Sequence, residues 1–231
     1  MPEQVLKAPC LVLFCKRPAL HQGKQRLAAT IGAEQAHVFA RALLDCALED
    51  LQSWPGPVVL SPATAEDGPW ASTLLARPHQ VIPQPEGGLG DRLWTVDRDL
   101  RATGLNRIIF MGSDAPMLTP DHFDAARKAL TDSDVILSPA LDGGVTLMGT
   151  DKGWPDMTDL PWSTEKLGAE LEKLCGERGD QVKHIMPSYD IDVEADLLRL
   201  YQDLSCDLRP ARQNLYGLLD VFLNREGTKY G

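Results

Sequence analysis

The stretch NRIIFMGSD, residues 106–114, is the most clearly patterned segment of this chain. Its apolar run from Ile108 to Met111 is followed by two small residues and then by Asp114. A short apolar run that ends in a turn is typical of a buried strand. Ligands of open α/β sheets bind just beyond the carboxyl ends of the strands, so this pattern marks Asp114 as a candidate ligand contact.

Strands and helices alternate on both sides of this segment. We predict further strands at 9–15, 57–61, 79–83, 134–140, 145–150 and 181–187. We predict helices at 33–54, 193–204 and 209–226. A further helix follows the glycine-rich turn 84–93 and ends near Gly104, one begins at Thr119, and one follows Ser163–Thr164. This alternation favours a three-layer α/β/α fold with a mostly parallel sheet. The short link between 134–140 and 145–150 predicts one antiparallel strand pair.

Length and composition narrow the class of protein. The 231 residues fit one large α/β domain without a long linker, so we predict a single domain over 1–231, with 205–231 as a C-terminal helical extension. A formal net charge of −10 argues against a nucleic-acid-binding surface, which needs a basic face. Five scattered cysteines without a CxxC pair indicate neither a disulfide framework nor a structural zinc site. The chain has no apolar run of the roughly 18 residues that a membrane helix needs and no signal-peptide pattern, so we expect a cytoplasmic protein without a membrane span.

The stretch FCKRPALHQGKQRLAATIG, residues 14–32, carries four cations and no carboxylate. The carboxylate-free window extends over the 30 residues 4–33, where chance would place roughly four acids. A strand followed by a solvated loop would explain part of this bias. The alternative is a binding site for an anion, with Lys24 and Arg26 as the candidate contacts.

Polar side chains follow four of the predicted strands, and parallel topology would bring these strand ends to one edge of the sheet. One is the loop that carries the cations from Lys16 to Arg26, which we call the basic loop. The others are Ser113–Asp114, the Asp142–Gly144 turn and the acidic segment 189–192. Cations and carboxylates in one crevice suit a phosphate-containing ligand with Mg²⁺ or Mn²⁺, because these ions prefer oxygen ligands. Each feature also has a structural explanation: Asp142–Gly144 suits a hairpin turn and Asp192 suits a helix N-cap.

Six short motifs, in order between about residues 9 and 200, match the pattern of a known family. The matching residues are Lys16, Pro18, Lys24, Arg26 and Leu27; Gln84, Gly87, Leu89, Gly90, Asp91 and Arg92; Gly112, Ser113, Asp114, Pro116 and Leu118; Pro139, Asp142, Gly143, Gly144, Leu147 and Gly149; Trp162, Ser163 and Thr164; and Asp190, Ile191, Asp192, Asp196 and Leu197. On these motifs the chain resembles the bacterial GT-A-fold transferases that are labelled radical-SAM/selenodomain-associated glycosyltransferases. It is more distantly similar to the phospholactate and molybdenum-cofactor guanylyltransferases.

Five positions depart from this family's pattern. His21 replaces a loop glycine, Gln25 a loop threonine and Gly88 an aspartate, while Val145 replaces a tyrosine and Val193 a threonine. His21 and Gln25 lie in the basic loop, which would contact phosphate. Val145 lies where a sugar or an acceptor would bind. The departures therefore indicate a changed substrate preference or a reduced activity.

The resemblance implies a Rossmann-like GT-A domain that is a metal-dependent transferase of a nucleotide-activated sugar, with an acceptor that the sequence does not identify. A nucleotidylyltransferase that releases pyrophosphate and a non-catalytic nucleotide-binding module are the alternatives. The implied catalytic residues are Lys24, Arg26 and Asp142, and the implied metal ligands are Asp114 and Asp192. The implied nucleotide contacts are Lys16, Lys24, Arg26, Gln84, Gly87, Gly88, Gly90, Arg92 and Ser113. The implied sugar or acceptor contacts are Gly143, Gly144, Ser163 and Thr164.

Overall fold

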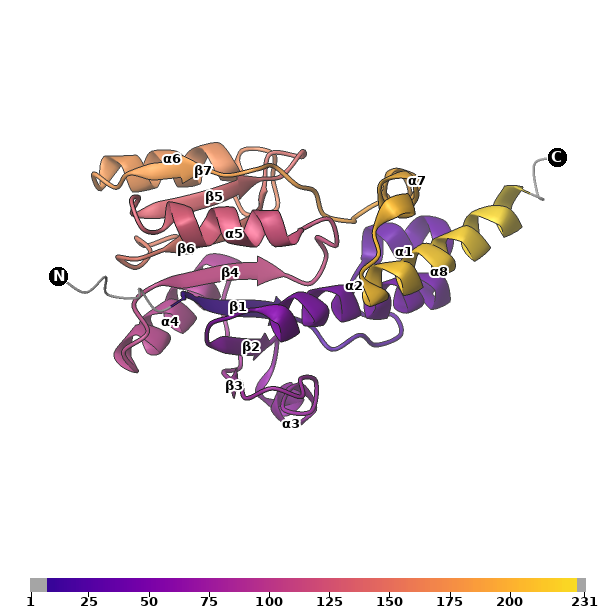
Figure 1. Cartoon of the computed structure of the whole chain (residues 1–231), viewed down its shortest axis with the longest axis horizontal. Helices are drawn as coiled ribbons and strands as arrows, with labels where there is room; N and C mark the ends of the chain where they lie inside the picture. Colours follow the sequence, from indigo (N-terminus) through magenta and orange to yellow (C-terminus); the bar gives the residue numbers. More distant parts are fainter. Residues whose placement is uncertain (1–7, 228–231) are drawn as a thin grey trace.

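The computed structural model of the chain describes residues 8–227 and is built around one seven-stranded sheet (Figure 1). The strands are β1 (Cys10–Cys15), β2 (Val58–Pro62), β3 (Gln80–Val81), β4 (Ile108–Gly112), β5 (Val135–Pro139), β6 (Val145–Thr150) and β7 (Val182–His184). They are ordered β3-β2-β1-β4-β6-β5-β7. The central strands are apolar and almost fully buried, which is why the sequence marks them so clearly.

One strand, β6, runs against all the others. It pairs antiparallel with β4 on one side and with β5 on the other, whereas every other pairing is parallel. The expected hairpin between β5 and β6 is confirmed, with Pro139 opposite Val145. The tight turn folds β6 back into the gap between β4 and β5, so the sheet contains two antiparallel pairings where the sequence indicated one.

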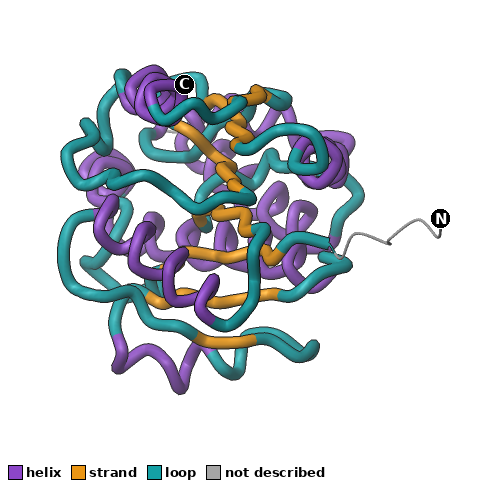
Figure 2. The backbone as a smooth tube through the Cα atoms, turned by 90° about the vertical axis from the view of Figure 1, so that its left-hand side faces the viewer, coloured by secondary structure: helices purple, strands orange, loops and turns teal. Residues whose placement is uncertain are grey.

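Helices cover both faces of the sheet, as the three-layer prediction requires (Figure 2). They are α1 (Gln25–Ile31), α2 (Ala33–Ser53), α3 (Gly68–Ala71), α4 (Leu89–Ala102), α5 (Pro120–Ala129), α6 (Leu167–Glu177), α7 (Glu194–Asp203) and α8 (Pro210–Gly227), with short 3₁₀ turns at Ala65–Asp67 and Leu204–Cys206. Leu51 of α2, Ala71 of α3 and Phe123 of α5 pack on one face. Leu93 of α4 and Leu171 of α6 pack on the other face.

A third apolar core lies beyond the carboxyl ends of the parallel strands, where α1, α7 and α8 gather around α2 (Figure 1). Phe39 of α2 meets Phe222 of α8 edge to face, with ring centroids 5.6 Å apart. The described part of the predicted C-terminal extension is therefore packed against the rest of the chain. Residues 1–7 and 228–231, the ends of the predicted single domain, lie outside the described residues.

Three predicted boundaries are wrong. The strand predicted at 79–83 is limited to 80–81, and the strand predicted at 181–187 is limited to 182–184. The helix expected directly after Ser163–Thr164 begins only at Leu167. Ser163 has a φ of 63°, and the Thr164 hydroxyl donates to the Pro161 carbonyl at 2.7 Å, so these residues form a turn ahead of the helix. Within residues 8–227, no helix combines the length and apolar character needed to cross a membrane.

Candidate functional site

The segment 189–192, which follows β7, alternates between the third core and the open edge of the sheet. Tyr189 and Ile191 are buried in that core, whereas Asp190 and Asp192 are only half-buried. An alternation with a period of two is typical of extended backbone, in which successive side chains point in opposite directions. The apolar residues of this segment thereby aim both carboxylates at the same side.

Asp114 is held beside this segment by the backbone. The Ile191 amide donates to the Asp114 carbonyl at 3.0 Å, which ties the turn after β4 to the segment after β7. One carboxylate oxygen from each of Asp114, Asp190 and Asp192 lies within 4.8 Å of the others. We call these three residues the acidic cluster.

Lys24 reaches into the acidic cluster from the basic loop. Its Nζ donates to Asp114 Oδ2 at 3.0 Å, to Asp192 Oδ1 at 3.2 Å and to the Ile191 carbonyl at 2.6 Å. Nη1 of Arg26 lies 3.7 Å from Asp192 Oδ2, but this side chain is 68% exposed. The predicted phosphate contacts and the predicted metal ligands are therefore brought together at one edge of the sheet.

The electrostatic balance of the acidic cluster shows in two pKa values. Burial raises the pKa of Asp190 to about 6, and the neighbouring carboxylates of Asp114, Asp142 and Asp192 raise it in the same direction. Burial would lower the pKa of Lys24, but the carboxylates of Asp114 and Asp192 outweigh it and raise the pKa above its ordinary value. The lysine therefore stays charged, whereas the pKa of the Asp190 carboxyl group lies closer to neutral pH than that of an ordinary aspartate.

The Asp142–Gly144 turn contributes a fourth carboxylate close enough to affect Asp190. Asp142 Oδ1 accepts a hydrogen bond from the Gly144 amide at 3.0 Å, which is typical of a turn that begins with aspartate. A Cβ atom on Gly143, whose φ is 89°, would stand 2.0 Å from the Glu165 carbonyl oxygen. The glycine thus allows the turn to lie directly against the segment that carries the exposed residues Ser163 and Thr164.

The predicted nucleotide contacts around α4 form a second group with its own hydrogen bonds. Arg92 Nε donates to the Gly87 carbonyl at 2.8 Å, and Gln84 Nε2 donates to the Ser61 carbonyl at 2.8 Å. The Gly88 amide donates to Asp91 Oδ2 at 3.0 Å, at the start of the helix. Gly90 is buried, and a Cβ there would lie 2.3 Å from the Met157 carbonyl oxygen, so close packing explains this glycine.

Two further predicted contacts are exposed or half-buried. Lys16 is exposed at the end of β1, at the opposite end of the basic loop from Lys24, and Ser113 is half-buried next to Asp114. The structure therefore places Ser113 at the acidic cluster and leaves Lys16 at the far end of the loop.

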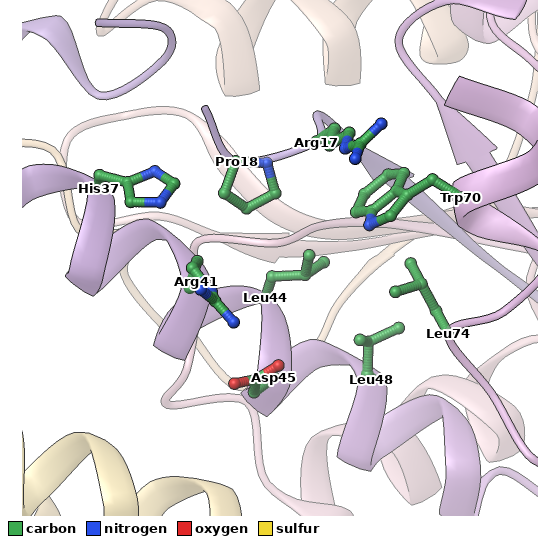
Figure 3. Close-up of a pocket in the computed structure, with 9 residues that line it drawn as sticks. All are labelled: Arg17, Pro18, His37, Arg41, Leu44, Asp45, Leu48, Trp70 and Leu74. Carbon is green, nitrogen blue, oxygen red and sulfur yellow. The ribbon is translucent and has the colours of Figure 1, made fainter. Parts of the chain in front are cut away.

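A hollow of about 280 Å³ lies on the outer face of α2, beside α3 (Figure 3). Arg17 Nη1 stands 3.8 Å from Asp67 Oδ1, and burial raises the pKa of Asp45 while Arg41 lowers it. The charges in and around this hollow are therefore largely balanced, and the acidic cluster is not part of its lining. The lining residues are Arg17, Pro18, His37, Arg41, Leu44, Asp45, Leu48, Trp70 and Leu74.

A family profile described as "Uncharacterized protein conserved in bacteria (DUF2064)" matches residues 43–164, just over half of the chain. The chain belongs to this family. The matched part of this DUF2064 protein contains Asp114 and the Asp142–Gly144 turn, whereas Lys24, Asp190 and Asp192 lie outside it. No curated protein matches the chain.

Solved structures share the fold of this DUF2064 protein. A Desulfovibrio desulfuricans G20 protein, provisionally assigned as a nucleotide-diphospho-sugar transferase, is 24% identical with a TM-score of 0.85, over 95% of this chain and 98% of that one. A homologue of Mycobacterium tuberculosis Rv0371c from Mycobacterium sp. strain JC1 is 15% identical with a TM-score of 0.52, over 84% and 96% of the two chains. The bifunctional IspDF of Campylobacter jejuni is 11% identical with a TM-score of 0.51, over 82% of this chain and 53% of that one. At these identities the likeness shows a nucleotide-diphospho-sugar transferase-like fold, which confirms the predicted fold class.

The positions that depart from the resembled pattern have local structural consequences. His21 has a φ of 62°, a left-handed conformation that glycine adopts without strain, and its carbonyl accepts from Gln25 Nε2 at 2.9 Å. Val193 occupies the N-cap of α7 without a side-chain hydrogen bond. Its amide and that of Asp192 both donate to Asp196 Oδ2 at 2.8 Å, so Asp196 supplies the missing cap. Val145 is half-buried at the start of β6.

Asp190 is the cluster residue that sequence reasoning left out of the predicted metal ligands. The prediction assigned ligand roles to Asp114 and Asp192 alone. The signal was present in the order Asp-Ile-Asp, because two residues that are separated by one position point the same way in extended backbone.

Proposed function

We propose that this protein is a transferase that uses a nucleotide diphospho-sugar and depends on Mg²⁺ or Mn²⁺. The observation that carries the proposal is the convergence of the acidic cluster with Lys24 and Arg26 at the carboxyl edge of the sheet. In open α/β sheets this edge is where ligands bind. The provisional assignment of the Desulfovibrio protein with the same fold agrees with this substrate class.

The donor set of the acidic cluster fits a hard divalent cation. All three candidate ligand atoms are carboxylate oxygens within 4.8 Å of one another, and Mg²⁺ and Mn²⁺ favour such ligands. The side chains of Asp114 and Asp192 are 38% and 42% exposed, so a substrate can approach them. Bound there, the ion would supply positive charge against the diphosphate and stabilise it as a leaving group.

The side chains around the acidic cluster have distinct proposed roles. Lys24 and Arg26 bind phosphate oxygens, and the exposed Arg26 is the first that a substrate meets. Asp142, which faces the cluster from the β5–β6 turn, accepts the proton of an acceptor hydroxyl. The sugar or acceptor lies against Gly143, Gly144, Ser163 and Thr164. The nucleotide lies along Lys16, Gln84, Gly87, Gly88, Arg92 and Ser113, and buried Gly90 supports this surface by its close packing.

Nucleotidyl transfer is the second candidate function. The pairing of Lys24 and Arg26 on Asp192 favours it, because departing pyrophosphate carries more negative charge than a nucleoside diphosphate. An acceptor phosphate is already ionised and needs no general base, so Asp142 would then be dispensable.

The leaving group distinguishes the two reactions. The protein is incubated with Mg²⁺ or Mn²⁺, a panel of nucleoside triphosphates and nucleotide sugars, and candidate hydroxyl and phosphate acceptors. Release of a nucleoside diphosphate is expected and identifies glycosyl transfer, whereas release of pyrophosphate identifies nucleotidyl transfer. Metal-dependent binding without turnover would indicate a non-catalytic nucleotide-binding module and contradict both enzymatic functions.

Two variants test the site. Asp114→Asn removes one carboxylate charge from the acidic cluster and is expected to abolish turnover. Asp132→Asn makes the same chemical change at an exposed residue beyond the far end of α5 and is expected to retain it. Equal turnover in the two variants would mean that the site lies elsewhere.

A further inference from the structure

Lys24 binds two of the three carboxylates that a metal ion at the acidic cluster would use. Its ammonium group donates to oxygens of Asp114 and Asp192, and both residues belong to the acidic cluster. The third acceptor is the carbonyl of Ile191, between the two aspartates of the segment after β7. The lysine side chain is only 14% exposed, so water does not replace these contacts. A divalent ion and Lys24 would therefore compete for the carboxylate groups of Asp114 and Asp192.

The backbone holds Lys24 in this position. Lys24 is the N-cap of α1 with a φ of 45° and a ψ of 40°, a left-handed conformation that side-chain-bearing residues rarely adopt. Its carbonyl accepts from the Ala28 amide at 2.8 Å, and Leu27 anchors the helix in the third core. On the other side, His21 to Gly23 are exposed. A strained residue between an anchored helix and an exposed loop is well placed to change conformation when a ligand arrives.

We propose that Lys24 is an internal counter-ion that a phosphate-bearing substrate draws away from the acidic cluster, so that metal and nucleotide bind cooperatively. This inference rests on the proposed function, since it describes how metal and nucleotide bind to the same site. The metal alone meets an ammonium group among its ligands, and the nucleotide alone meets three carboxylates. When both bind, phosphate oxygens pair with Lys24 and the carboxylates pair with the metal.

The charges of the surrounding groups support this coupling. Among the side chains that the structure describes, those of residues 8–224, none forms an ion pair with Asp190, and Asp142 adds further negative potential. A phosphate group is therefore repelled until a cation enters. The side chain of Arg26 is exposed, so its charge lies at the outer edge of the acidic cluster. Because binding free energies are linked, the factor by which nucleotide strengthens metal binding equals the factor by which metal strengthens nucleotide binding.

The test measures Mn²⁺ binding to the metal-free protein by the electron paramagnetic resonance signal of the free ion. Lys24→Met removes the ammonium group and keeps an unbranched side chain, and it is expected to bind Mn²⁺ alone about tenfold more tightly than the wild type. Lys128→Met, on an exposed residue at the far end of α5, makes the same change in net charge and is expected to leave the affinity unchanged.

A second measurement uses inorganic pyrophosphate as the phosphate probe. In the wild type, Mn²⁺ and pyrophosphate together are expected to raise the melting temperature by more than the sum of their separate effects. In Lys24→Met the two effects are expected to add. Lys24→Gln, which is neutral but keeps a hydrogen-bond donor, repeats both measurements if the methionine variant does not fold.

The outcomes separate this inference from the proposed function. If the neutral Lys24 variant binds Mn²⁺ no more tightly than the wild type, while Asp114→Asn still abolishes Mn²⁺ binding, the counter-ion role is wrong and the metal site stands. If neither the wild type nor the Lys24 variants bind Mn²⁺, with or without pyrophosphate, the metal site of the proposed function is wrong as well.

Discussion

Two of the clusters of ionised side chains in the described part of the chain, the acidic cluster and a second one near α8, join distant segments. They differ in how completely their hydrogen-bonding groups are used. In the acidic cluster, Asp114 and Asp192 are 38% and 42% exposed. The second cluster lies where α8 meets α2 and is centred on Arg212, whose side chain is fully buried. We call it the arginine cluster; its members are Glu49, Asp50, Asp207, Arg209 and Arg212.

Every N–H of the Arg212 guanidinium has an acceptor. Nη2 donates to Asp50 Oδ2 at 2.6 Å, Nη1 donates to Glu49 Oε2 at 3.0 Å, and the remaining contacts go to the carbonyls of Cys46, Pro116 and Leu118. Burial would lower the pKa of Arg212, but Asp50 beside it raises the pKa, so the charge persists. A saturated, buried cluster has no free site for a ligand, whereas the acidic cluster keeps accessible carboxylate oxygens. Saturation and exposure, more than charge, separate a structural cluster from a candidate binding site.

The largest effect on folding is expected from Arg212→Met. The substitution removes the cation that pairs with half-buried Glu49 and buried Asp50, and it leaves Asp50 only Arg209 as a partner. Breaking a buried pair in this way costs about 3–5 kcal/mol. Urea denaturation of the metal-free protein measures the loss. A change below about 1 kcal/mol would show that the arginine cluster does not stabilise the packing of α8 on α2.

Asp114→Asn is expected to abolish the response to metal while changing the fold little. An ion at a hundred times its dissociation constant stabilises a protein by about 2.7 kcal/mol, which is about 5–10 °C in melting temperature for a chain of this size. Thermal unfolding with and without Mn²⁺ measures this shift, with Asp132→Asn as the matched control. A shift that survives in Asp114→Asn would place the metal outside the acidic cluster.

The acidic cluster is also expected to give the metal-free protein a specific pH dependence. The pKa of Asp190 is raised from 3.8 to about 6, so between these values the folded protein binds this proton more tightly than the unfolded chain does. The resulting stabilisation is fully present below about pH 4 and is lost as the pH rises through about 6.

Asp190→Asn isolates this contribution, because burial also raises the pKa of Asp50 to about 6. The unfolding free energy of the wild type relative to Asp190→Asn should fall with increasing pH across this window. A difference that is independent of pH would contradict the raised pKa of Asp190.

The smallest effect is expected from Arg26→Gln. Its contact with Asp192 spans 3.7 Å on a side chain that is 68% exposed, and ion pairs of this kind contribute about 0–1 kcal/mol. Urea denaturation at low and high salt is expected to show nearly the same stability for the variant and the wild type. A loss comparable to that of Arg212→Met would remove the contrast between the two clusters.

The sequence predicted the candidate site in part. The strand before Asp114 and the alternation through Asp192 are local patterns, since each depends on the order of apolar and polar residues along a few positions. The contact of Lys24 with both Asp114 and Asp192 required the structure. Those contacts join residues separated by 90 and 168 positions, and no short-range pattern encodes them.

The arginine cluster was not predicted at all. Arg212 lies in a stretch that reads as an ordinary helix with mixed polarity, and arginine is usually exposed in helices. Its burial follows from the docking of α8 onto α2, which brings Glu49 and Asp50 within reach of the guanidinium.

By itself, the sequence determined the α/β class, most of the strands and helices, and the chemistry offered at the carboxyl ends of the strands, because hydrophobic periodicity and turn residues act over a few positions. Only the tertiary structure decided that β6 enters between β4 and β5, that Lys24 occupies the acidic cluster and that Arg212 is buried. Those outcomes depend on which surfaces of distant segments bury one another, and that is a property of the folded chain as a whole.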